Sequence, residues 1–160
     1  MLLAALIINI SLVAVTVIIH YEILRLLSNM IPRMRIRLRL RVVFGVFGTI
    51  CAHIVEVCLF GVAFYLMIHQ GGFGDLTGSF NGSLVDSVYF SFINYTTVGY
   101  GDIVPTGSLR FLAGLEAITG LSLITWSASF MFMEMTMFWD KETTESNQRR
   151  EQSATGEESQ

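Results

Sequence analysis

The run Thr96-Thr97-Val98-Gly99-Tyr100-Gly101-Asp102 decides the fold that we predict for this chain of 160 residues. Gly99 and Gly101 can adopt backbone conformations that are costly for other residues. The run lies between a short helical pattern at residues 84–95 and a long apolar stretch at residues 109–138. The run predicts a fold only when it is considered together with the two segments that flank it.

Three stretches are long and apolar enough to cross the hydrocarbon core of a bilayer, which is about 30 Å thick. Hydrophobic residues make up 52% of the chain, more than we expect of a soluble domain of this size. We predict an all-α membrane protein with transmembrane helices at residues 1–27, 42–69 and 109–138. The first stretch is longer than a signal-peptide core and has no basic residue ahead of it, so we expect it to stay in the mature protein.

An arginine-rich linker at residues 28–41 joins the first two apolar stretches and predicts the orientation. By the positive-inside rule the linker is cytoplasmic, which places the N-terminus outside and the C-terminus inside a plasma or inner membrane that the chain crosses several times. A voltage sensor is disfavoured, because the arginines recur at every second residue and not at every third. A site for one specific lipid stays an alternative to general contact with anionic headgroups. The arginines expected to make that contact are Arg33, Arg35, Arg37, Arg39 and Arg41.

The end of the chain differs sharply from the rest in composition. From Asp140 onward it consists largely of Glu, Ser, Thr, Gln and Arg, without an aliphatic residue larger than alanine. Such a segment cannot bury enough apolar surface to fold alone, so we predict a disordered cytoplasmic tail at residues 139–160. The net charge of −3 says little about partners, because the charges are segregated along the chain, and we expect no nucleic-acid partner.

The backbone of the opening run suits one chemical task. A dehydrated potassium ion needs oxygen ligands in place of its water shell, and a row of backbone carbonyls that point inward can supply them. We therefore expect K⁺ to be coordinated by residues 97–100, with Gly101 completing the row and the Thr97 hydroxyl at its inner end. Val98 and Tyr100 are expected to point away from the ion and to pack against the preceding helix.

The segment before the run predicts a half-helix at residues 84–95. Ser83 followed by Asp86 is an aspartate version of the capping box that begins helices. A half-helix that ends near the middle of the membrane aims the negative end of its dipole at a cation. Irregular backbone at this depth is tolerated only where it lines a wet pathway, so half-helix and loop support one another.

Residues 42–138 resemble the two-helix pore module of the potassium-channel superfamily, with an outer helix at 42–69, a pore helix at 84–95, a filter at 96–102 and an inner helix at 109–138. The small prokaryotic pore-loop channels, or single-pore relatives of the tandem-pore family, are the most similar members. The resemblance implies selectivity for K⁺ over sodium and a fourfold symmetric homotetramer, because one chain supplies one of four loops.

The resemblance also implies which residues support the filter. These are Thr96, Asp102 and Tyr89, the last standing where the family often has a tryptophan that bonds the aspartate. Ile93 stands where some bacterial members have a glutamate, which leaves the inactivation behaviour open. Beyond the pore module we find no regulatory domain, so the stimulus that opens the pore is unassigned.

The last apolar stretch carries a polar face. Four of its residues share one side by the 3.6-residue period and are predicted to line a water-filled cavity: Ile118, Ser122, Thr125 and Ser129. The alternative is that these hydroxyls merely bond back to their own helix. Gly120 is either a gating hinge or a site of close packing between helices.

A polar side chain in an apolar membrane segment is costly without a partner, so we expect partners for several residues of this kind. Glu116 is predicted to face the back of the filter or a neighbouring helix, either bonded permanently to a pore-helix hydroxyl such as Ser91 or acting in gating by protonation. His53 and Glu56 share a helix face and are expected to form a buried pair, whereas a metal site there is disfavoured because one helix offers only two ligands. His20, with its neighbour Glu22, is expected to reach toward the lipid headgroups.

The two cysteines, Cys51 and Cys58, are expected to be unbridged and buried as small hydrophobes. We see no nucleotide loop, no nucleophile with its base and no closed metal cluster, so we expect no enzyme and no cofactor apart from the permeant ion. Passive conduction of K⁺ is the expected activity. A less selective cation channel and a non-conducting regulatory subunit are the alternatives.

Overall fold

The computed structural model describes residues 2–34 and 36–157 and is mostly helical. Among these residues, three helices are long and apolar enough to span a membrane, over Leu3–Arg33, Leu40–Gln70 and Leu109–Met137. The predicted all-α membrane fold is therefore confirmed. The elements in chain order are α1 (Leu2–Met30), the 3₁₀ helix η1 (Ile31–Arg33), α2 (Leu38–Gln70), β1 (Leu76–Gly78), α3 (Leu84–Tyr95), β2 (Ile103–Pro105) and α4 (Leu109–Glu157).

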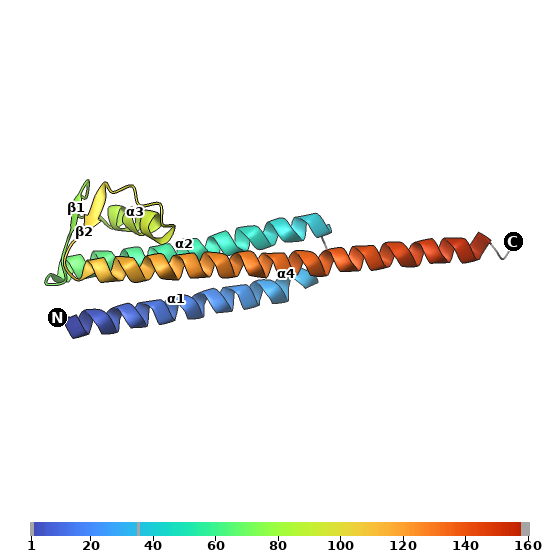
Figure 1. Ribbon diagram of the computed structural model, residues 1–160, viewed down its shortest axis with the longest axis horizontal. Coiled ribbons are helices and arrows are strands. Elements are labelled where there is room, and N and C mark those ends of the chain that lie inside the picture. Colours follow the sequence, from blue (N-terminus) through green and yellow to red (C-terminus); the bar gives the residue numbers. More distant parts are fainter. Residues whose placement is uncertain (1, 35, 158–160) are drawn as a thin grey trace.

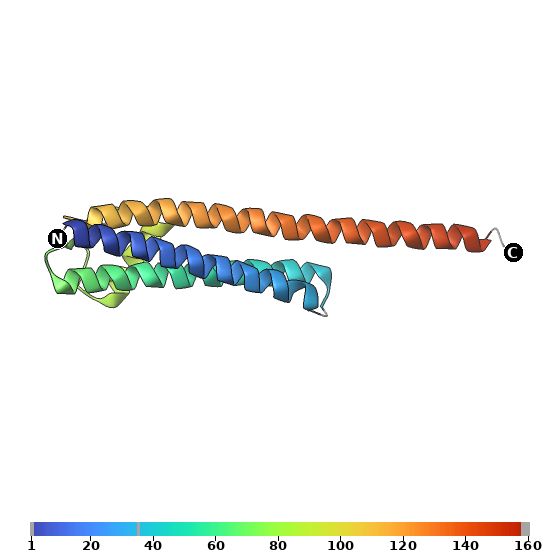
Figure 2. The same ribbon diagram turned by 90° about the horizontal axis from the view of Figure 1, so that it is seen from below.

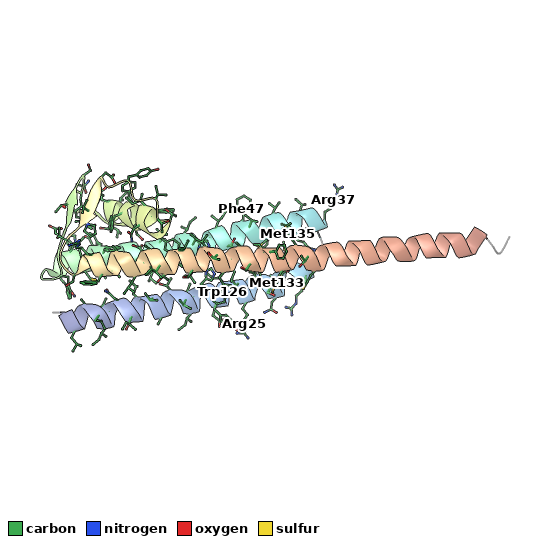
Figure 3. All side chains as sticks on the ribbon, viewed as in Figure 1. Arg25, Arg37, Phe47, Trp126, Met133 and Met135 are labelled. Atoms are coloured by element: carbon green, nitrogen blue, oxygen red, sulfur yellow. The ribbon has the colours of Figure 1, made fainter. Side chains whose placement is uncertain are left out.

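The three long helices run side by side, and α2 is antiparallel to α1 and α4 (Figures 1 and 2). The start of α1, the end of α2 and the start of α4 lie together at one end of the bundle, where α3 and the two strands also lie. The segment that joins α1 to α2 lies toward the opposite end. Figure 3 shows Arg37 at that opposite end of α2, far from α3. The N-terminus and the half-helix thus share one side, as the predicted topology requires.

The helices are longer than the sequence predicted. α1 continues to Met30, three residues past the expected end, and Pro32 then lies in the 3₁₀ turn, where its missing N–H costs no α-helical bond. α2 already begins at Leu38, and it ends where Gly71 takes a φ of 72° and donates its N–H to the Ile68 carbonyl, 3.1 Å away. The glycine suits this left-handed position.

The predicted disordered tail at residues 139–160 is a further difference. In the described residues α4 runs without a break to Glu157, as the red end of the ribbon in Figure 1 shows. The physical reason is local. The segment is rich in Glu and Gln and also contains Arg149, Arg150 and Lys141, all residue types that favour helix, and it has no proline to stop a helix that is already nucleated. A low apolar content excludes a packed core and does not exclude continuation of an existing helix.

The start of α3 is built by short side chains. The Ser83 hydroxyl accepts a hydrogen bond from the N–H of Asp86 at 3.0 Å, which confirms Ser83 as the N-cap. The Asp86 carboxylate accepts from the N–H of Asn81 at 2.9 Å, and the Asn81 side chain accepts from the N–H of Ser83. The helix thus begins at Leu84, where the sequence predicted it.

A small antiparallel ribbon, which the sequence did not predict, pins the loops on both sides of α3. Strand β1 pairs with β2 in the register Leu76 opposite Pro105 and Gly78 opposite Ile103. Gly78 has a φ of 99°, and a Cβ atom there would lie 2.1 Å from the carbonyl oxygen of Asp102. Only glycine permits this approach, which holds Asp102, the last residue of the filter run (residues 96–102), against the segment before α3.

The core lies where α3 packs into the angle between α2 and α4. Phe60 and Phe64 of α2 are fully buried, and the Phe64 ring meets Phe90 of α3 edge to face with the ring centroids 4.9 Å apart. Gly61 lets α3 approach closely, because a Cβ there would lie 2.7 Å from the Cα of Val88. Such contacts hold a half-helix that has few backbone bonds of its own.

The cysteines correct one expectation. Both are free, as predicted, yet Cys51 and Cys58 are exposed on this chain and not buried. They lie on a side of α2 that the other described residues leave open. On a membrane helix an exposed apolar face is solvated by lipid or by a neighbouring subunit, so the rule that apolar residues are buried within the chain fails there.

Candidate functional site

The filter run has a regular alternation in its backbone. Thr97, Gly99 and Gly101 have φ values of 58°, 55° and 78°, while Val98 and Tyr100 between them have negative φ. In an ordinary strand successive carbonyls point to opposite sides. An alternation of left-handed and right-handed residues turns successive carbonyls toward the same side, which is what a row of ion ligands requires. Thr97 is the one described non-glycine residue with positive φ, a conformation that costs roughly 1–2 kcal/mol.

The run is fastened to the end of α3. The N–H of Thr97 donates to the Asn94 carbonyl at 2.9 Å, and the N–H of Gly99 donates to the Ile93 carbonyl at 3.1 Å. The Thr96 hydroxyl donates to the Phe92 carbonyl at 2.7 Å, so this predicted support residue caps the helix end. These bonds satisfy carbonyls that the last turn leaves open and fix where the loop begins.

Tyr89 and Asp102 meet beside the C-terminal end of the run, as expected from their roles as supports. The Tyr89 hydroxyl donates to the Asp102 carboxylate at 2.9 Å. This hydrogen bond, which the charged phenolate could not donate, raises the pKa of the Tyr89 phenol. The other carboxylate oxygen of Asp102 is buried and makes no hydrogen bond within the described part of the chain.

Val98 and Tyr100 do not make the packing that we expected. Both side chains are exposed on the single chain, Val98 by 54% and Tyr100 by 72%. The predicted packing against the preceding helix is therefore wrong within one subunit. The reason is geometric: α3 fastens the start of the run through its backbone and leaves the side-chain face of the run open.

The predicted polar face of α4 exists, and so does its alternative. Ile118 is 67% exposed, and the three hydroxyl residues on this face are exposed as well. Each hydroxyl also bonds back to its own helix, from Ser122 to the carbonyl of residue 118, from Thr125 to that of residue 121 and from Ser129 to that of residue 125, at 2.8–3.0 Å. The face is therefore open but presents hydroxyls whose protons are already engaged.

Gly120 is a close-packing position. A Cβ atom there would lie 2.3 Å from the carbonyl oxygen of Tyr95 and 2.9 Å from its Cγ. Tyr95 is the last residue of α3 and is 1% exposed. The absent side chain thus lets the end of the half-helix rest directly on α4. Of the two predicted roles, this geometry favours close packing, with α3 as the partner.

Glu116 lies behind the half-helix and is fully buried in a hydrogen-bonded network. The Ser91 hydroxyl lies 2.8 Å from the Val57 carbonyl and is also hydrogen-bonded to Glu116. The Ser91 hydroxyl is the donor in both contacts, so the Val57 carbonyl and the Glu116 carboxyl share its single proton. The Asn94 amide donates to the other carboxyl oxygen at 2.6 Å. Both oxygens of the buried carboxyl therefore have hydrogen-bond partners on α3, which offsets the cost of its burial.

His53 and Glu56 form the expected buried pair, with His53 Nδ1 3.0 Å from the Glu56 carboxylate. A third residue, His20 of α1, corrects our prediction for it. It is fully buried, and its Nδ1 lies 2.7 Å from Glu56. The Tyr95 hydroxyl also donates to Glu56. The sequence spacing within α2 could not identify His20 as a partner of Glu56, because His20 lies on α1. A histidine in an apolar helix does, however, indicate that a polar partner lies near it.

The arginine end is only partly described. Arg33 and Arg37 are exposed, and Arg41 donates to the Met34 carbonyl at 2.6 Å. Arg35 and the side chain of Arg39 lie outside the described residues. Glu22 is exposed, as predicted, and lies 3.4 Å from Arg25.

Comparison with known proteins agrees with this geometry. The family model described as "Ion channel" matches residues 52–137, more than half of the chain, from the middle of α2 through α3 and the filter run into α4. A protein of Arabidopsis thaliana named "Two-pore potassium channel 1" is 29% identical over 106 residues. The match covers 66% of this chain and 24% of that protein, so the chain spans about a quarter of its relative's length. No solved structure matches.

Proposed function

This chain belongs to the ion-channel family whose model it matches, and we propose that it is one subunit of a channel that conducts K⁺ selectively and passively. The observation that carries the proposal is the positive φ at every second residue from Thr97 to Gly101, within the complete filter run. Carbonyls turned to one side replace the hydration shell of K⁺. The relative's printed name supports the same ion.

We also propose that four chains assemble around the filter. One chain supplies one strand of carbonyls, and closed cyclic symmetry completes the ring. Two features of the single chain support a neighbour: the exposed Val98 and Tyr100, and the buried Asp102 oxygen without a partner among the described residues. In the assembly Thr97, Val98, Gly99 and Tyr100 coordinate K⁺, and the α4 face that begins at Ile118 lines a cavity below them.

The orientation in the membrane follows the charges. The arginine end of α1 and α2 is cytoplasmic, with Arg33 and Arg37 against anionic headgroups, and the end with α3 is outside. The half-helix then enters from the outside and points its C-terminus into the membrane. Its dipole favours a cation at the inner end of the filter.

Reconstitution in liposomes tests the proposal. With K⁺ on one side and Na⁺ on the other, the reversal potential of the purified protein should lie far toward the K⁺ equilibrium value. Comparable permeability for the two ions would instead indicate a less selective cation channel. A correctly assembled protein without current would indicate a non-conducting subunit, and either outcome contradicts the proposal.

Gly99→Ala tests whether this run is the filter. A Cβ at a φ of 55° costs roughly 1–2 kcal/mol in each chain, and the substitution should abolish selective conduction. Gly71→Ala is the matched control, because Gly71 has a φ of 72°, also has nothing within 4 Å of an added Cβ, and lies at the end of α2. Selectivity unchanged by Gly99→Ala, or lost equally in Gly71→Ala, would show that the run is not the filter.

A further inference from the structure

Three potential metal ligands from two helices lie close together beside Tyr95, the last residue of α3. His20 comes from α1, and His53 and Glu56 come from α2, one turn apart. One ligand atom from each lies within 4.8 Å of the other two. His20 Nδ1 is 2.7 Å and His53 Nδ1 is 3.0 Å from the two oxygens of the same carboxylate. Both imidazoles therefore present the same nitrogen to one space.

A bound cation would balance the negative charge of the Glu56 carboxylate in this cluster. Glu56 and His20 are fully buried, and the His53 side chain is 19% exposed. The three groups that contact the Glu56 carboxylate are two imidazoles and the Tyr95 phenol, and none of them carries a permanent positive charge. A buried carboxylate is costly unless it is paired with a charge or coordinates a metal. A divalent ion supplies that charge and takes all three residues as ligands.

The ligand types select the class of ion. Two imidazole nitrogens and one carboxylate suit zinc and its neighbours in the transition series, whereas Mg²⁺ and Ca²⁺ prefer oxygen alone. Bonds of about 2.0–2.1 Å in a tetrahedron place ligand atoms roughly 3.3 Å apart. The separations of 2.7 Å and 3.0 Å between each imidazole Nδ1 and the Glu56 carboxylate need only a small opening to reach that value, and all three ligand atoms already lie within 4.8 Å of one another. The Tyr95 hydroxyl, 3.0 Å from His53 Nδ1, or a water is available as the fourth ligand.

The surroundings also orient the ligands. His20 Nε2, the nitrogen that would not bind the metal, lies 3.4 Å from the Ser127 hydroxyl of α4. The His20 ring stands 5.4 Å from that of His53 and 5.4 Å from that of Trp126, which Figure 3 labels on α4 facing α1. A partner on the second ring nitrogen and packing against the ring are what hold metal-bound histidines in position. The partly exposed His53 leaves a route of entry.

We propose that His20, His53 and Glu56 form a binding site for one divalent transition-metal ion of the zinc class in each chain. The site joins α1 to α2 and lies against Tyr95, the residue that ends the half-helix. Its existence does not depend on which ion the pore conducts. Its test therefore uses binding and not current.

Cobalt is the probe, because Co²⁺ bound to nitrogen and oxygen ligands absorbs in the visible range. The full-length protein, purified in detergent without a histidine tag and stripped with a chelator, is titrated with Co²⁺ and then with Zn²⁺. We expect visible bands that saturate at one ion per chain and disappear when Zn²⁺ displaces Co²⁺. Absence of the bands in a folded wild-type protein would overturn the proposal and leave a hydrogen-bonded cluster only.

The chain offers a matched control, since it has three histidines and the third, His69, is exposed at the end of α2. His53→Gln and Glu56→Gln should each weaken Co²⁺ binding by more than about 100-fold, the upper range for loss of a mere supporting residue at a metal site. His69→Gln should bind as the wild type does. Binding that survives in His53→Gln, or that is lost in His69→Gln, would place the metal elsewhere.

A second measurement covers variants that fold poorly. Because a ligand that binds only the folded state stabilises it, Zn²⁺ should raise the unfolding temperature of the wild type and of His69→Gln. Any folded variant of His20, His53 or Glu56 should show no such shift. An equal shift in these variants would contradict the site.

Discussion

The contact between Gly120 of α4 and the end of α3 can be tested by adding one methyl group. In Gly120→Ala the new Cβ would lie 2.3 Å from the Tyr95 carbonyl oxygen and 3.0 Å from its carbonyl carbon. Carbon and its neighbours normally approach to about 3.5 Å. The added atom is therefore about 1 Å too close to backbone, which no rotation of a side chain can relieve.

The magnitude follows from two opposing effects. Overpacking of a core costs about 1–3 kcal/mol, and a clash with backbone belongs at the upper end of that range. Alanine in place of glycine favours the helix by about 1 kcal/mol. The net loss is about 2 kcal/mol in each chain. It should appear as a lower dissociation or unfolding temperature, and as altered conduction, because Tyr95 directly precedes the filter run.

Gly114→Ala provides the control on the same helix. An added Cβ at Gly114 has nothing within 4 Å, so this variant gains the helix propensity without the overlap. We would measure thermal unfolding by circular dichroism and K⁺ flux in liposomes for the wild type and both variants. A hinge at Gly120 would give a different result, with open probability reduced and thermal stability unchanged or raised. That result would refute the close-packing interpretation.

Three further substitutions probe the supports of the filter. Ser91→Ala leaves the Val57 carbonyl and Glu116 without their buried partner and should cost about 1–3 kcal/mol in thermal unfolding. Glu116→Gln, whose amide can still hydrogen-bond to Ser91 and Asn94, should be nearly neutral. A flattened pH dependence of open probability in Glu116→Gln would support gating by protonation instead. Tyr89→Phe should destabilise the wild-type fold at neutral pH. The pKa of Tyr89 is raised above its usual value of about 10. The difference in stability between the wild type and Tyr89→Phe should therefore be complete below about pH 10 and vanish as the pH rises through the raised pKa. A difference in stability that persists in strong base would show that the bond to Asp102 is not its cause.

Much of this fold was predictable, because membrane helices and helix caps are encoded locally. The start of α3 was predicted from Ser83 and Asp86 alone, and the start of α4 at Leu109 also agreed. The end of α1 and the start of α2 were not, since a helix continues into polar sequence: α1 runs on to the turn that contains Pro32, and α2 takes in the last residues of the arginine-rich linker. The ribbon between β1 and β2 depends on pairing across the whole of α3, which no local pattern encodes.

The candidate site divides in the same way. Glycines at alternate positions of the filter run could be predicted to need left-handed backbone, and the pairing of Glu116 with Ser91 was among the alternatives. The partner that α1 supplies to Glu56 was missed, because His20 is 36 positions away and only the packing of α1 against α2 brings it close. The exposure of Val98 was missed as well, because its packing depends on how α3 holds the start of the run in space and not on a local pattern.

The burial of His20 against Glu56 also limits how this protein can be dissected. The family match begins at residue 52, which suggests that the pore portion could be excised or grafted as a unit. Glu56 lies inside that portion, yet one of its hydrogen-bond partners is supplied by α1. A pore portion transferred without α1 would lack the His20 hydrogen bond to Glu56. The Glu56 carboxylate, which lies directly behind Tyr95, would then be partly exposed to lipid. A chimera of the pore portion should therefore include α1, or replace Glu56 by a residue that needs no partner.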